Sequence, residues 1–139
     1  MNVIIKNVKG LENTFMYELH ENSIFNKELL MGLIFEIIDL VRKAQEGNLS
    51  DKSLLNSFKD LFRIYEITSS YLKCHYKPND VYHIKDLPED YVEYVNRLVF
   101  VMKMLLARDY DAIVKYEDEI GSLINEYEGQ AKLVKQPSV

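Results

Sequence analysis

The sequence predicts an all-α protein, folded as an antiparallel four-helix-type bundle with a short N-terminal extension. Apolar residues recur at steps of three and four over four long stretches, which is the spacing of one face of an α-helix. Capping residues and helix-ending Gly or Pro residues separate these stretches. The connections between them are short, which is typical of antiparallel neighbours in a bundle.

The first predicted helix spans residues 26–46 and is apolar on most sides. Asn26 or Ser23 can cap its N-terminus, and Gly47 is placed to end it. Its polar residues follow one another at steps of three and four and therefore form one narrow edge: Glu28, Gly32, Glu36, Asp39 and Lys43. A helix with so little polar surface is expected to be buried on most sides.

The second predicted helix spans residues 51–76. Ser50 can cap it and Pro78 stops it. Its inward seam has steps of four and three: Leu54, Phe58, Leu61, Tyr65, Thr68 and Leu72. We expect Asp60 and Lys73 to mark the solvent-exposed face.

The third predicted helix follows a polar and aromatic loop over residues 78–87. Asp86 and Glu89 have the spacing of a capping box, and Pro88 suits a first helical turn. The helix should end near Ala107. Its segment from Leu98 to Met102 is apolar all round, so this helix also should be widely buried.

The fourth predicted helix begins after a possible cap at Asp109 and ends at Gly129. Its apolar seam consists of Ile113, Tyr116, Ile120, Leu123 and Tyr127. Its outer face is acidic, with Asp111, Glu117, Asp118, Glu119, Glu126 and Glu128. We expect residues 1–129 to form a single domain and residues 130–139 to form a flexible tail.

Residues 1–22 are the N-terminal extension. The apolar run Val3–Ile5 predicts a short strand. Leu11, Phe15 and Leu19 recur every four positions, which favours a short helix up to Glu21. Alternation of apolar residues between Phe15 and Leu19 leaves a strand open as the alternative.

Composition excludes several classes of protein. A net charge of −5 argues against a general nucleic-acid binder, whose affinity comes from Lys and Arg at phosphates. No segment reaches the ~18 uninterrupted apolar residues of a membrane span, and the N-terminus does not resemble a signal peptide. The single cysteine, Cys74, is typical of a reducing compartment, so we expect a cytoplasmic protein.

No pattern of catalytic or metal-ligating residues is present in the sequence. The candidate ligands His20, Cys74, His75, Asp80 and His83 lack the Glu-x-x-His spacing of di-iron bundles and the Cys or His pairs of zinc sites. Cys74 and His75 are adjacent on a helix and therefore point in different directions. We expect no enzyme activity, no cofactor and no metal.

The stretch from Tyr71 to Lys85 mixes aromatic and cationic residues on an otherwise acidic chain. Its candidate binding residues are Lys73, His75, Tyr76, Lys77, Tyr82 and His83. Such residues can stack bases or grip anions, and they also suit a protein interface. The structural alternative is a helix end whose tyrosines close the bundle.

The first and third helices carry more apolar surface than a four-helix bundle needs. Phe100 is the clearest case, because it interrupts a polar edge. Residues 1–22, a second copy of the chain or another protein could cover the surplus, and burial beneath residues 1–22 is the simplest account. The acidic fourth helix, with Glu117 and Asp118, would suit a partner with a basic surface.

These features predict a non-enzymatic protein-binding module, such as a chaperone, an adaptor or a small inhibitor of the phage anti-defence or toxin-neutralising kind. A ligand- or nucleic-acid-binding module that uses Tyr71–Lys85 is the alternative. The segment Leu30–Glu36 resembles the hydrophobic-Tyr-Asp stretch of flagellin export chaperones, with Phe35 and Glu36 substituted. The following Gly-Ala of that family is Ile37-Ile38 here, so the resemblance is short and assigns no family.

Overall fold

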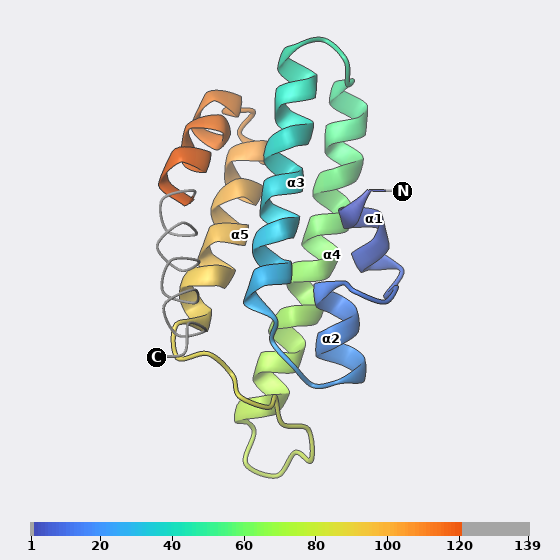
Figure 1. Ribbon diagram of the computed structural model, residues 1–139, viewed down its shortest axis with the longest axis vertical. Helices are drawn as coiled ribbons and strands as arrows, with labels where there is room; N and C mark the ends of the chain where they lie inside the picture. Colours follow the sequence, from blue (N-terminus) through green and yellow to red (C-terminus); the bar gives the residue numbers. More distant parts are fainter. Residues whose placement is uncertain (1, 121–139) are drawn as a thin grey trace, which may run out of the picture.

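The described residues fold into helices that run along one common direction (Figure 1). The structure is a computed structural model and describes residues 2–120. Five helices have defined ends: α1 (Val3–Val8), α2 (Phe15–Glu21), α3 (Lys27–Gln45), α4 (Asp51–Tyr76) and α5 (Tyr91–Leu106). A sixth helix covers residues 110–120 and is named helix 110–120 below. The predicted end of this helix at Gly129 and the predicted tail lie outside the described residues.

The four longer helices form an antiparallel bundle, and the all-α prediction is confirmed. α5 packs on both α3 and α4. Helix 110–120 lies beside α5 and α3 (Figure 1), and side-chain contacts from Gln45 to Asp111 and from Arg42 to Glu117 join it to α3. α1 and α2 pack on α3 and α4, on the side away from helix 110–120.

Three predicted helix caps are confirmed. The side chains of Asn26 and Ser50 accept the backbone N–H groups of Leu29 and Ser53, over 3.1 and 3.2 Å. The Asp109 carboxylate accepts the N–H of Ala112 over 3.2 Å. Each cap satisfies a backbone donor that has no partner within its helix, which explains why the starts of α3, α4 and helix 110–120 are predictable.

The predicted start of the third helix at Asp86 and Glu89 is wrong. Asp86 has a left-handed backbone conformation, with φ of 50°, and α5 begins only at Tyr91. The cause lies far away in the sequence: the N–H of Lys85 donates to the carbonyl of Ser23 over 2.7 Å, in a short parallel bridge beside Ile24. This bridge keeps the loop extended up to Lys85, and the chain turns at Asp86.

The predicted strand at Val3–Ile5 is also wrong, because these residues open α1. The side chain of Asn2 caps the helix at the N–H of Ile5, and Ile4 is buried. The buried Asn7 donates to the carbonyl of Val3 and accepts the N–H of Met16 over 3.1 Å. It thereby joins α1 to α2, whose prediction as a helix is confirmed.

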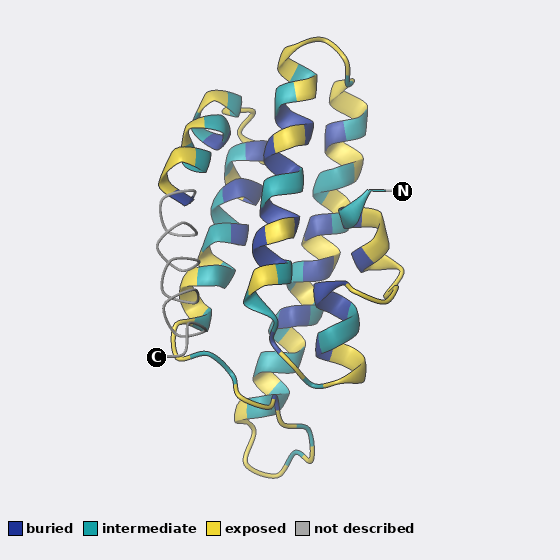
Figure 2. Ribbon diagram, viewed as in Figure 1, coloured by how far each residue is buried: buried dark blue, intermediate teal, exposed yellow. Residues whose placement is uncertain are grey.

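The core lies where α3 meets its neighbours (Figure 2). As predicted, α3 is buried on most sides, and its polar edge is exposed except for the half-buried Glu36. In the predicted seam of α4, Leu54, Leu61 and Thr68 are buried and the other three residues are half-buried. Asp60, expected on the solvent-exposed face, is half-buried.

The surplus apolar surface is covered in two different ways. α1 and α2 cover parts of α3 and α4. Phe100 of α5, in contrast, packs against Tyr116 of helix 110–120, with 4.4 Å between ring centroids. Phe100 is therefore not covered by residues 1–22. No helix within residues 2–120 has the length and apolar character required to cross a membrane.

Candidate protein-docking surface

The predicted stretch from Tyr71 to Lys85 forms the lower end of the bundle in Figure 1. The ring of Tyr82 packs on that of Tyr71, with 4.9 Å between centroids. The Tyr82 hydroxyl donates to the carbonyl of Leu19 in α2 over 2.8 Å. These contacts engage both tyrosines in closing the bundle end, and burial raises the pKa of each hydroxyl.

The histidines at this end also have partners within the chain. His75 accepts the N–H of Ile84 at Nδ1 over 2.9 Å, and its ring contacts those of Tyr76 and His83 edge to face. His20 of α2 is hydrogen-bonded to the hydroxyl of Tyr71. No group of three or more His, Cys, Asp or Glu side chains in residues 2–120 is arranged to hold a metal ion.

Cys74 and Asp80 influence each other in the same region. Partial burial is the main cause that raises the pKa of the Cys74 thiol, and a hydrogen bond to the Asp80 carboxylate adds to it. The pKa of Asp80 is lowered, chiefly because its carboxylate accepts the N–H of Tyr82 over 3.0 Å. A thiol with a raised pKa forms little thiolate, the form of cysteine that acts as a nucleophile.

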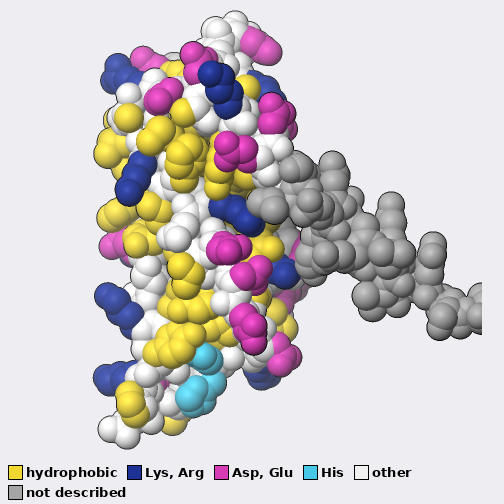
Figure 3. Space-filling model, turned by 90° about the vertical axis from the view of Figure 1, so that its left-hand side faces the viewer, with side chains coloured by type: hydrophobic (Ala, Val, Ile, Leu, Met, Phe, Trp, Pro, Cys, Tyr) yellow, Lys and Arg dark blue, Asp and Glu magenta, His cyan; other side chains and the backbone are white. Residues whose placement is uncertain are grey.

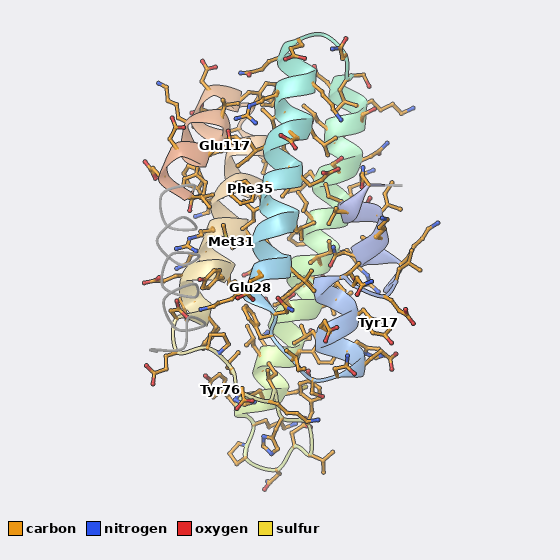
Figure 4. The ribbon with its side chains drawn as sticks, viewed as in Figure 1. Tyr17, Glu28, Met31, Phe35, Tyr76 and Glu117 are labelled. Carbon is orange, nitrogen blue, oxygen red and sulfur yellow. The ribbon has the colours of Figure 1, made fainter. Side chains whose placement is uncertain are left out.

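The other predicted binding residues lie well above this end of the molecule. Phe100 is half-buried against Tyr116, and Glu117 forms an ion pair with Arg42 of α3 (Figure 4). Asp118 is exposed on helix 110–120. The fold thus brings Lys73, His75, Tyr76, Lys77, Tyr82 and His83 together, and it separates them from Phe100, Glu117 and Asp118.

Tyr76 remains largely exposed, and it ends an apolar stripe that runs along α4. Leu55, Phe62 and Tyr76 lie seven and fourteen residues apart and have exposed fractions of 52, 45 and 60%. Position 69, seven residues from both Phe62 and Tyr76, is the half-buried Ser69 and interrupts the apolar stripe. A spacing of seven residues is close to two helical turns, so these side chains lie on one side of α4.

A second stripe runs along α5 with the same spacing. It consists of Val92, Val99 and Leu106, of which Val92 is 49% and Leu106 66% exposed. Because α4 and α5 are antiparallel neighbours, Leu106 lies near Leu55, and the ring of Tyr91 lies 6.2 Å from that of Tyr76. The two stripes, Leu55, Phe62 and Tyr76 with Val92, Val99 and Leu106, are together called the apolar band.

The upper end of the apolar band borders a cavity of about 280 Å³. Its apolar lining consists of Leu54, Leu55, Phe58, Leu105 and Leu106, and its polar lining of Asp51, Lys52, Arg108 and Tyr110. The Tyr110 hydroxyl donates to the Asp51 carboxylate over 3.4 Å. An apolar hollow with a charged rim is the usual setting for an anchoring side chain from a partner.

The two edges of the apolar band carry different charges. The outer face of α4 and its C-cap is mainly basic, with Lys52, Lys59, Arg63, Lys73 and Lys77 exposed and Glu66 among them. The opposite edge is mainly acidic, and its exposed carboxylates are Glu89, Asp90, Glu93, Asp111, Asp118 and Glu119. Lys103 and Lys115 are the exposed cations among them. Figure 3 shows hydrophobic side chains from top to bottom of this side, several Lys and Arg down its left edge, and most Asp and Glu on its right half.

Tyr76 is the one residue of the apolar band that is also among the binding residues predicted from the sequence. The signal that could have found the rest is the repeated spacing of seven in both helices, together with their antiparallel pairing. The apolar band and its charged edges are the observations from which a function is argued below, since the chain matches no protein-family model, no curated protein and no solved structure.

Proposed function

We propose that this protein is a non-enzymatic helical protein-binding module whose apolar band docks an α-helical face of a partner protein. The observation that carries the proposal is the exposed seven-residue spacing on two adjacent antiparallel helices. Such a pair of stripes forms a groove in which a further helix can pack its own apolar side chains. Water-exposed apolar surface of this extent is uncommon on a monomer that has no partner.

The cavity beside Leu55 and Leu106 supports the proposal, because binding energy concentrates where an anchoring side chain fills a hollow. Fully burying a Leu or Phe side chain stabilises a complex by about 1.5–3 kcal/mol. The side chains of the apolar band are already about half-buried, so each can gain about half of that amount.

Chaperone, adaptor and inhibitor roles all fit this proposal, and the charged edges restrict the partner. Glu117 is engaged by Arg42, so the acidic edge is available for a basic partner surface through the other exposed carboxylates, which include Glu89, Glu93 and Asp118. A cytoplasmic location is part of the proposal, because a single unpaired cysteine suits a reducing compartment.

Photo-cross-linking in cells of the native host tests the proposal. A photoreactive amino acid would replace Phe62 or Leu106 in the apolar band, and the partly exposed Ile5 of α1 as a control outside the band. We expect one protein to cross-link from both band positions and not from Ile5, through a peptide that belongs to an amphipathic helix. The same adduct should disappear when Leu55→Glu is added. Equal labelling from Ile5, or no adduct at either band position, would contradict the proposal.

A nucleic-acid-binding module is the second candidate, and the basic edge of α4 favours it. Lys73, Tyr76 and Lys77 are exposed beside one another at the end of α4, and Lys85 is exposed in the following loop. Anisotropy of a labelled single-stranded RNA in a salt series tests this candidate, since phosphate contacts weaken steeply with salt. Binding that falls with salt and disappears in Lys73→Glu/Lys77→Glu would favour it, and salt-independent or absent binding would reject it.

A further inference from the structure

We infer that the partner of the apolar band is a second copy of this chain, in a dimer whose two-fold axis runs along the band. The inference rests on the proposed function, since it requires the apolar band to be a docking surface. It is carried by the charge of the two edges: one side of the band is mainly basic and the other mainly acidic. A surface of this kind is complementary to itself.

The direction of the axis follows from the charges. A two-fold axis parallel to the helices places each residue of the second copy at the same height as its equivalent in the first. It also brings the left edge of one copy opposite the right edge of the other. The basic edge on α4 of one copy then lies opposite the acidic edge of the other. An axis across the helices would leave each edge opposite itself, so that Lys59 and Arg63 would face cations of the second copy. Juxtaposed like charges oppose association, so the axis runs along the helices.

The lower end of the molecule shows the complementarity most clearly. α4 ends at Tyr76 at the level where α5 begins, since the rings of Tyr76 and Tyr91 lie 6.2 Å apart. Lys73 and Lys77 therefore lie at about the height of Glu89 and Glu93. The Glu93 side chain is 68% exposed, and the contact of its carboxylate with Arg97 within α5 is long, at 4.0 Å. In the parallel dimer, Lys73 and Lys77 of each copy therefore face Glu89 and Glu93 of the other.

Apolar contacts fill the centre of this interface. At the upper end, Leu106 is the most exposed member of the apolar band and lies at the mouth of the cavity. The axis places α4 of one copy opposite α5 of the other, so Leu106 packs against Leu55 of the second copy. The two cavities then lie side by side and are closed together.

Light scattering on the full chain measures the mass directly. We expect twice the 16.4 kDa of one chain, and one chain for Phe62→Glu or Leu106→Glu. The control Ile5→Glu should leave the dimer intact, and circular dichroism checks that every variant is folded. A monomer at all concentrations, or a dimer that survives both band substitutions, would overturn the inference.

Charge reversal tests the predicted edge contacts. Lys73→Glu/Lys77→Glu and Glu89→Lys/Glu93→Lys should each weaken the dimer at least tenfold, because like charges then meet at both edges. An equimolar mixture of the two variants should form a heterodimer of near wild-type affinity, since opposite charges meet again at both edges. Two variants that remain monomeric when mixed would overturn the parallel arrangement.

Disulfide formation determines the direction of the helices. In a Cys74→Ser background, a mixture of Leu55→Cys and Leu106→Cys at the upper end should cross-link between chains, and so should a mixture of Tyr76→Cys and Val92→Cys at the lower end. Cross-linking only in a mixture of Val92→Cys and Leu106→Cys would mean an antiparallel dimer and would overturn the inference. If the chain is monomeric while Phe62 and Leu106 still cross-link to a different protein in cells, the second-copy inference fails and the proposed function stands. If neither occurs, both fail.

Discussion

The hydroxyl of Tyr82 donates a hydrogen bond to the backbone carbonyl of Leu19, 63 residues earlier in the chain, over 2.8 Å. This bond attaches the loop between α4 and α5 to α2. Together with the bridge between Ile24 and Lys85, it closes the lower end of the bundle. The loop between α4 and α5, which the sequence predicts as a binding segment, therefore also stabilises the lower end of the fold.

Tyr82→Phe removes this hydrogen bond and leaves the ring in place. Because the carbonyl of the buried Leu19 then lacks this partner, we expect a loss of about 1–2 kcal/mol in the free energy of unfolding. Urea denaturation measures it. Tyr17→Phe in α2 is the matched control, because within residues 2–120 its half-buried side chain has no such hydrogen bond, and its midpoint should not change. Equal effects of the two substitutions would show that the Tyr82 bond does not stabilise the fold.

Asn7→Leu should destabilise the protein by about 2–3 kcal/mol, a larger loss than for Tyr82→Phe. Asn7 is buried, and its side chain serves both the carbonyl of Val3 and the N–H of Met16. Leucine has the same branching and the same number of non-hydrogen atoms but leaves both groups without this partner. The exposed Asn56→Leu on α4 is the control and should cost little. A thermal melt compares the three proteins, and a wild-type midpoint for Asn7→Leu would refute the role of the bond.

Cys74 should react slowly with iodoacetamide near neutral pH. Because burial and Asp80 raise the thiol pKa, the rate should rise at higher pH than it does for a free cysteine. Asp80→Asn removes the negative charge beside the thiol, so the pH profile should move toward lower pH. Asp86→Asn, at an exposed turn, should leave the profile unchanged. If the pH profile is the same with and without Asp80, the Asp80 carboxylate does not contribute to the raised pKa of the Cys74 thiol.

Phe100→Ala should loosen helix 110–120 more than the rest of the bundle. The ring of Phe100 packs on Tyr116, and a half-buried aromatic ring contributes about 1–2 kcal/mol. Hydrogen exchange should therefore rise in residues 110–120 and stay near wild-type in α4. Val92→Ala, on the exposed side of α5, is the control. Unchanged exchange in residues 110–120 would mean that the ring contact does not hold this helix in place.

The long helices were predictable because their signals are local. α3 and α4 each combine a side-chain cap at the first turn with an apolar spacing over many turns. α1 was not predictable as a helix, since three consecutive apolar residues suit a strand and the helix depends on Asn2 and on the contact of Asn7 with α2. The start of α5 depends on a backbone bond to Ser23, which leaves no local trace in the sequence.

The candidate site was less predictable for a related reason. On α4 the buried seam and the exposed stripe are adjacent, so they appear in the sequence as one broad apolar face. Which part of that face is covered depends on where α1, α2 and α5 lie. The aromatic and cationic residues around His75 indicate a binding site in the sequence, but the fold determines their hydrogen bonds and ring contacts.

The spacing of the stripe on α4 has a geometric consequence for any helix that binds it. Seven residues fall short of two full turns of a straight helix, so the stripe drifts by about 20° for every seven residues. Between Leu55 and Tyr76 this drift amounts to about 60° around α4. A straight helix would leave the stripe before reaching its end. A partner that contacts all of it must therefore wind around α4 as a left-handed supercoil.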